Sequence, residues 1–151
     1  MTTRISKILR ASTRVIRVGP KTTVLEAVGV MMTQNVASVI VLDENEKLIG
    51  IFTERDLLRR VVAPGLDPAT IHIEKVMTDR VHTVDQNATS EEVRALMENH
   101  HIRHVPVVVD GAVMDVISLR DILRCENEDK TFEIDQLMGY VSNKPYPRYP
   151  A

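Results

Sequence analysis

An internal duplication constrains the fold of this chain more than any other feature. Residues 18–58 recur about 66 positions later as residues 84–123. In each copy an apolar strand leads into a hydroxyl residue that is followed, three positions on, by an aspartate, at 53–56 and at 118–121. Two copies of one unit provide either two equivalent sites or one site at their seam. We therefore expect the functional residues to lie where the copies meet.

Each copy is predicted to contain the same elements in the order β-α-β-β-α. Runs of apolar residues bounded by turn residues predict strands, at 15–18, 39–42, 48–52, 81–84, 105–109 and 113–117. Thr23 with Glu26 and Thr89 with Glu92 form capping boxes, which start helices. A second helix is expected in each copy, at about 54–62 and 119–125.

Helix-spaced apolar residues predict the buried faces of the first helix of each copy, at Leu25, Val28 and Met32 and at Val93, Leu96 and Met97. One copy alone is too small to close a core, so the copies must pack together. The expected fold is α/β, of the α+β type, with repeats at 1–66 and 67–128 and a C-terminal segment at 129–151.

The C-terminal segment is expected to form a short amphipathic helix over about 132–141 and an extended, polyproline-like end at 145–150. This tail would cover an apolar surface, pair with a second chain or bind a partner. The first 25 residues are basic without an acid, which also fits an organelle transit peptide. Because residues 15–18 already belong to the repeat, we favour a role of this segment in the fold.

Composition excludes several classes of function. The net charge of −2 gives no general attraction to nucleic acid or membrane, and 3% aromatic residues supply few stacking platforms for single-stranded nucleic acid. Cys125 is the single cysteine, so a reducing, cytoplasmic setting without disulfides is expected. No apolar run approaches the roughly 20 residues of a membrane span.

The hydroxyl-x-x-Asp elements allow two interpretations. Ser or Thr followed by Asp three positions on is itself a helix-capping pattern, which would make the helices at 23, 53, 89 and 118 begin alike. The same helix starts offer free amides to a phosphate, and an Asp carboxylate suits a ribose diol. Because two such elements occur at matching positions, each after an apolar strand, ligand binding remains an alternative to helix capping alone.

These elements, together with 50–56, 117–121 and 101–106 (His-Ile-Arg-His-Val-Pro), resemble a tandem CBS-domain protein, or Bateman module, of the small stand-alone bacterial kind. The resemblance covers about residues 5–125 and implies two β-α-β-β-α repeats packed as one pseudo-twofold module. It also implies regulatory binding of an adenosine-containing ligand between the repeats, such as AMP, ADP, ATP, NAD or S-adenosylmethionine. Homodimers are a further implication.

The resemblance also assigns site residues by position. At the first site Asp56 would bind the ribose hydroxyls, and Thr53 would form a hydrogen bond with the ribose or a phosphate. The backbone near Ile16 would recognise the edge of the adenine ring. Arg103 and His104 would approach the phosphates there, and Glu54 and Arg55 are additional contacts. The second site would use Ser118, Asp121 and the backbone near His82.

The two sites are expected to differ. Asp115 stands in the second copy where the first has Gly50, and Ala37 and Ser38 stand where the second copy has Arg103 and His104. We therefore expect the first site to be the occupied one.

A metal site and catalysis are both disfavoured by the sequence. His100, His101 and His104 are spaced for a metal, but the strand beginning at 105 breaks a shared helix face. No nucleophile elbow, Gly-rich phosphate loop or His-Glu metal motif is present. The expected function is a non-catalytic nucleotide sensor acting on an unknown protein target. The alternative is a dimeric structural or interaction protein without a nucleotide.

Overall fold

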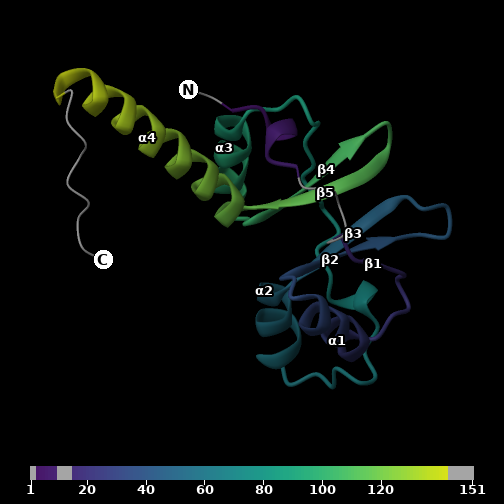
Figure 1. Cartoon of the computed structure of the whole chain (residues 1–151). Coiled ribbons are helices and arrows are strands. Elements are labelled where there is room, and N and C mark those ends of the chain that lie inside the picture. Colours follow the sequence, from purple (N-terminus) through teal and green to yellow (C-terminus); the bar gives the residue numbers. More distant parts are fainter. Residues whose placement is uncertain (1–2, 10–14, 143–151) are drawn as a thin grey trace.

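A computed structural model describes residues 3–9 and 15–142, and it contains the duplicated architecture (Figure 1). In the first copy β1 (Arg17–Val18) leads to α1 (Val24–Gln34), β2 (Ser38–Leu42), β3 (Leu48–Thr53) and α2 (Glu54–Asp56), which continues as the π-helical segment Leu57–Val62. In the second copy α3 (Ser90–His100) leads to β4 (His104–Val109), β5 (Ala112–Ser118) and α4 (Leu119–Ser142). The predicted α+β fold is confirmed.

The two sheets differ at one strand. In the first copy β1 runs parallel to β2 and β3 runs antiparallel to it, and the amide of Ile40 donates to the carbonyl of Ile16 at 2.9 Å. In the second copy β4 and β5 pair antiparallel, and the predicted strand 81–84 is reduced to a bridge between Val84 and Val107. The counterpart of Ile40 is Pro106, which has no N–H to extend the ladder to His82.

The leading segment of each copy packs into the core of the other copy. Ile5, in a short 3-10 turn (Ile5–Lys7), is fully buried with Val93, Met97 and Ile117. Ile73, in the corresponding turn Ile73–Lys75, is fully buried in the first core. A third apolar cluster of Val15, Ile40 and Val113 joins the two sheets. The copies therefore share one packed interior.

The buried face of α1 differs from the expected one by one position. Val24, Ala27 and Met31 are buried, whereas Leu25 and Met32 are exposed. Seven of the eleven residues of α1 are apolar and they extend around more than one side of the helix, so the three residues expected to be buried lie next to the face that is buried. On α3 the buried face agrees with the expected one, because Val93 and Met97 are buried and Leu96 packs against their cluster.

The helices expected at 119–125 and 132–141 are one continuous helix, α4, which projects from the second copy (Figure 1). No Gly or Pro interrupts the sequence between 119 and 138, so nothing ends the helix after residue 125. The helix runs across residue 128, where the second repeat was expected to end. The proposed polyproline end at 145–150 lies outside the described residues.

Candidate functional site

A cavity of about 950 Å³ lies at the seam between the two copies. The first copy contributes an apolar wall that includes Val15, Ile16 and Ile40. The second copy contributes the end of β5 and the first turns of α4, including Ser118 and Asp121. Arg17 links the two copies, because its guanidinium donates to the carbonyl of Val113 at 2.9 Å. Residues of both copies are thus needed to form this cavity.

Asp121 caps α4 and faces the cavity. Its Oδ2 accepts hydrogen bonds from the amide of Ser118 at 2.9 Å and from the Ser118 hydroxyl at 2.8 Å. The amide of Asp121 donates back to that hydroxyl at 3.2 Å. Within the described part of the chain, its other oxygen, Oδ1, accepts no hydrogen bond. The capping interaction therefore leaves one carboxylate oxygen of a half-buried Asp for a ligand.

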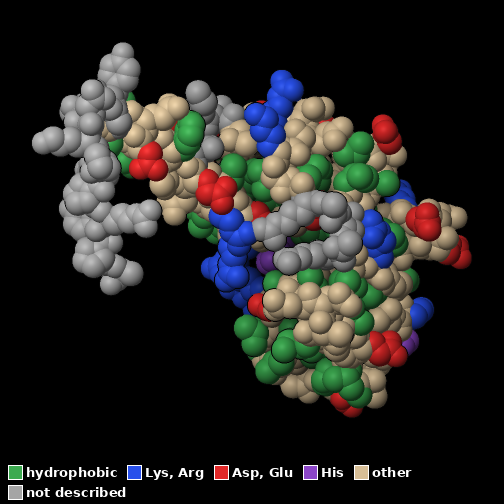
Figure 2. All heavy atoms as spheres, in the orientation of Figure 1, with side chains coloured by type: hydrophobic (Ala, Val, Ile, Leu, Met, Phe, Trp, Pro, Cys, Tyr) green, Lys and Arg blue, Asp and Glu red, His purple; other side chains and the backbone are tan. Residues whose placement is uncertain are grey.

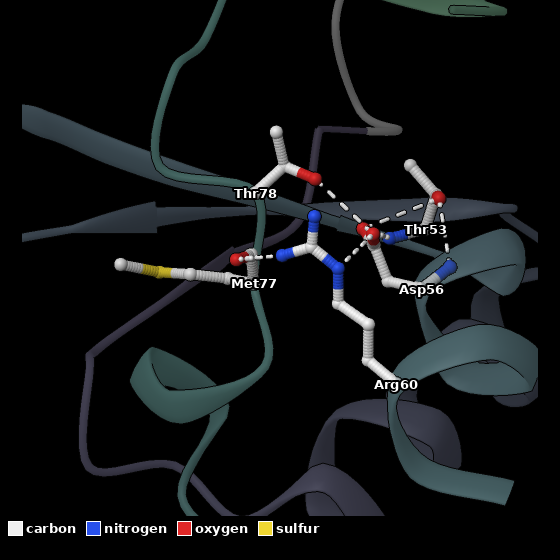
Figure 3. Close-up of polar contacts among 5 residues, drawn as sticks. All are labelled: Thr53, Asp56, Arg60, Met77 and Thr78. Atoms are coloured by element: carbon white, nitrogen blue, oxygen red, sulfur yellow. Dashed lines mark hydrogen bonds and ion pairs between the residues drawn. The ribbon is translucent and has the colours of Figure 1, made fainter. Parts of the chain in front are cut away.

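Asp56 has the same capping geometry but its carboxylate is fully engaged (Figure 3). Oδ2 accepts from the amide of Thr53 at 3.0 Å, and Oδ1 accepts from the hydroxyl of Thr78 at 3.1 Å. Arg60 approaches Oδ1 with Nε at 3.6 Å and donates from Nη1 to the carbonyl of Met77 at 2.8 Å. The segment that joins the copies therefore covers the first motif.

Gly50 has a packing role beside this closed motif. A Cβ at Gly50 would collide with the thioether of Met77, and the neighbouring Ile51 exchanges backbone hydrogen bonds with Thr78 at 2.8 and 2.9 Å. The missing side chain thus makes room for the joining segment. Its counterpart Asp115 lies on the cavity wall.

Cationic side chains gather at the cavity. Arg103, Arg120 and Arg124 line it, and Figure 2 shows blue side chains at the junction between the two halves of the molecule, near the start of α4. His104 also lines the cavity. Burial lowers the pKa of His104, with Arg103 acting in the same direction and the carboxylates Glu54 and Asp121 opposing it. The lowered pKa favours the neutral imidazole, in which one ring nitrogen donates a hydrogen bond and the other accepts one.

The structure brings together most, but not all, of the residues expected at the site. On the cavity wall lie Ile16, Glu54, Arg103, His104, Ser118 and Asp121. Ile16, Arg103 and His104 thus line the same cavity as the second motif, although the family resemblance placed them at the first. Neither Thr53 nor Asp56 lines the cavity, and the geometry favours the second motif over the first.

Two further expected residues contact the end of α3 instead. Arg55 donates to the carbonyl of His101 at 3.1 Å, and His82 stacks on His100 with ring centroids 3.7 Å apart. Sequence reasoning missed Arg120 and Arg124, which follow Ser118 on α4 and are four positions apart. Their helical spacing after the capping serine was the available signal.

No group of three His, Cys, Asp or Glu side chains within 3–9 and 15–142 is arranged to hold a metal ion. In the same ranges, no helix is both long enough and apolar enough to cross a membrane.

Comparison with known proteins gives a consistent family match. The family model described as the CBS domain matches residues 5–63 and again residues 73–128. An uncharacterized 17.7 kDa protein of Acidianus ambivalens is 32% identical over 125 residues, covering 82% of this chain and 73% of the relative. The mitochondrial CBS domain-containing protein CBSX3 of Arabidopsis thaliana is 30% identical, covering 79% of this chain and 60% of that protein.

Solved structures agree with this match. An uncharacterized conserved protein from Pyrococcus horikoshii superposes with a TM-score of 0.76 at 31% identity, covering 83% of this chain and 93% of the other. The CBS domain protein PAE2072 from Pyrobaculum aerophilum, solved in complex with AMP, has a TM-score of 0.71 over 79% of this chain and 89% of its own. At 24% identity, this second likeness shows the fold alone.

Proposed function

The chain belongs to the CBS-domain family as a tandem regulatory module, and from this premise we propose that it senses an adenosine-containing nucleotide in the cavity between its repeats. The observation that supports the proposal is that Ser118 and Asp121 line this cavity together with apolar residues of the first repeat. A non-catalytic role and a cytoplasmic location are part of the proposal.

The chemistry of the cavity matches the parts of such a nucleotide. The aliphatic side chains of Val15 and Ile16 provide a surface for the flat adenine ring, in a chain with few aromatic residues. The open carboxylate oxygen of Asp121 is suited to accept hydrogen bonds from a ribose diol. Arg120 and Arg124 provide charge-assisted donors for phosphate.

The ligands proposed are AMP, ADP, ATP and NAD, and PAE2072 supplies a precedent for AMP in a protein of this fold. A nucleotide held between the repeats would alter the surface offered to a protein target only if it bound two arrangements of the repeats with different affinity. A second copy of the chain is the further partner we propose.

A thermal-shift screen with AMP, ADP, ATP, NAD and S-adenosylmethionine tests the proposal. A ligand bound by the folded state alone raises the melting temperature, since binding adds to the free energy of unfolding. We expect at least one phosphate-containing nucleotide to raise it, and we expect Arg124→Gln to reduce that shift. No shift with any of them at roughly millimolar concentration would favour the alternative, a dimeric interaction protein without a nucleotide.

A further inference from the structure

The cavity between the repeats continues past Asp121 along α4. Four residues of α4 with spacings of three and four positions, and therefore on one side of the helix, line the cavity, namely Arg120, Leu123, Arg124 and Asn127. At a rise of about 1.5 Å per residue, the lined part extends roughly 9 Å along the axis from Asp121 to Asn127. The volume of about 950 Å³ is near the upper limit of roughly 1,000 Å³ for small-molecule pockets. The cavity therefore has room for a group beyond adenosine and its first phosphate.

Large apolar side chains from both repeats lie at the mouth of the cavity. Met32, in the last turn of α1, and Leu123, in α4, both line the cavity and are nevertheless 76% and 52% exposed. A ligand group that removes such apolar area from water gains binding free energy. Met32 and Leu123 therefore favour a flat or apolar group of the ligand at this end of the cavity.

Two side-chain amides accompany these apolar residues. Asn35, the C-cap of α1, lies three positions after Met32, and Asn127 lies four positions after Leu123. Both asparagines line the cavity, and neither side-chain amide forms a hydrogen bond within the described part of the chain. Each amide offers hydrogen-bond donors and an acceptor. We call Met32, Asn35, Leu123 and Asn127 the outer subsite.

The formal charges that line the cavity balance one another. Three arginines and three carboxylates line it, namely Arg103, Arg120 and Arg124 with Glu54, Asp115 and Asp121. Burial lowers the pKa of His104 and so favours its neutral form. Farther along α4 the next charged residues, Glu126 and Glu128, are acidic, and Glu126 is paired with Arg94 at 3.0 Å. The outer subsite is therefore poorly suited to a strongly negative terminal phosphate.

From these observations we propose that the cavity takes a dinucleotide, in which a diphosphate joins adenosine to a second nucleoside, and that the outer subsite binds the second base. A dinucleotide has no terminal phosphate, so it carries less negative charge than ADP or ATP. Along α4, Asp121 stands at the place for the adenosine ribose, Arg124 about one turn later for the diphosphate, and Asn127 a further turn later for an amide on the second ring. The inference rests on the proposed function, because it keeps adenosine at the Ser118 and Asp121 motif.

Isothermal titration calorimetry of the full chain with AMP, ATP, ADP-ribose and NAD tests the inference. ADP-ribose is NAD without its nicotinamide, so this pair isolates the contribution of the second base. We expect NAD to bind about tenfold more tightly than ADP-ribose, and more tightly than ATP.

A double substitution then locates the second base. Met32→Ala combined with Leu123→Ala should bind NAD no more tightly than ADP-ribose, with AMP binding retained. The matched control combines Leu25→Ala with Met114→Ala, which truncate apolar side chains that are 54% and 46% exposed and do not line the cavity. This control should keep the wild-type preference for NAD, and thermal unfolding should show both double variants folded.

The outcomes separate this inference from the proposed function. If AMP and ADP-ribose bind and NAD binds no more tightly, the outer subsite is refuted and the proposed function stands. Tighter binding of ATP than of NAD would have the same meaning. An equal loss of NAD affinity in the control variant would also overturn the inference. Absence of binding by all four compounds would overturn the inference and the proposed function together.

Discussion

Gly50 is a position where a single methyl group is expected to matter. Its missing side chain is replaced by the thioether of Met77, so an alanine Cβ must displace that flexible side chain, and Gly50→Ala should lower the free energy of unfolding by about 1 kcal/mol, the lower end of the cost of overpacking. Gly29 is the control, since a Cβ there meets nothing within 4 Å and the residue lies inside α1. Gly29→Ala should stabilise by about 0.5–1 kcal/mol. Urea unfolding measures both, and equal effects would contradict the packing role of Gly50.

His104 makes the free energy of unfolding depend on pH. Its pKa in the folded state is lowered below 6.5, chiefly by burial, so the unfolded chain takes up the proton first. The stabilisation is fully present above pH 6.5 and is lost as the pH falls through the folded-state pKa. We expect urea midpoints of the ligand-free protein to fall on acidification, and to fall less in His104→Gln. An unchanged slope in that variant would rule out His104 as the source.

All four helices that follow Thr23, Thr53, Thr89 and Ser118 begin with a hydroxyl side chain and an acidic side chain that cap each other's backbone amides. Thr89 accepts from the amide of Glu92 at 3.2 Å and Glu92 accepts from the amide of Thr89 at 3.0 Å, which completes the predicted capping box. Thr89→Ala should lower the free energy of unfolding by about 0.5–2 kcal/mol. Thr33, in the last turn of α1, bonds the carbonyl of Gly29 and is the control. Thr33→Ala should be neutral or stabilising, because Ala has the higher helix propensity.

Local sequence signals predicted where the helices begin, but they did not predict which faces of the helices are buried or which side chains are covered. Capping boxes and turn residues act over a few positions, so helix starts at Thr23 and Thr89 were predictable. Which side of α1 is buried depends on packing against distant residues, and seven apolar residues among eleven leave two adjacent sides of the helix as candidates. The closure of Asp56 depends on Thr78, which approaches from the segment that joins the copies, whereas Arg60 lies only four positions after Asp56. Comparing the two copies in sequence therefore favoured the Asp56 motif as the ligand site, because the sequence does not show that Thr78 covers it.

At the scale of the whole molecule, exchange of the leading segments should couple the two repeats. Ile5 is buried in the second core and Ile73 in the first, so removing either weakens the shared interior. Ile5→Ala and Ile73→Ala should each lower the free energy of unfolding by about 2–5 kcal/mol. Both should retain a single cooperative transition in calorimetry. Two separate transitions, or no effect of Ile5→Ala, would contradict this coupling.

The central claim is that the nucleotide binds at the seam through the second motif. Isothermal titration calorimetry with AMP, or with the nucleotide giving the largest thermal shift, tests it on wild type, Asp121→Asn and Asp56→Asn. Both substitutions alter a helix cap, so they are matched for loss of capping. We expect Asp121→Asn to weaken binding by about tenfold or more, because a hydrogen bond to a charged group contributes roughly 1.5–3 kcal/mol. Asp56→Asn should bind like wild type, and loss of affinity in Asp56→Asn alone would contradict the account.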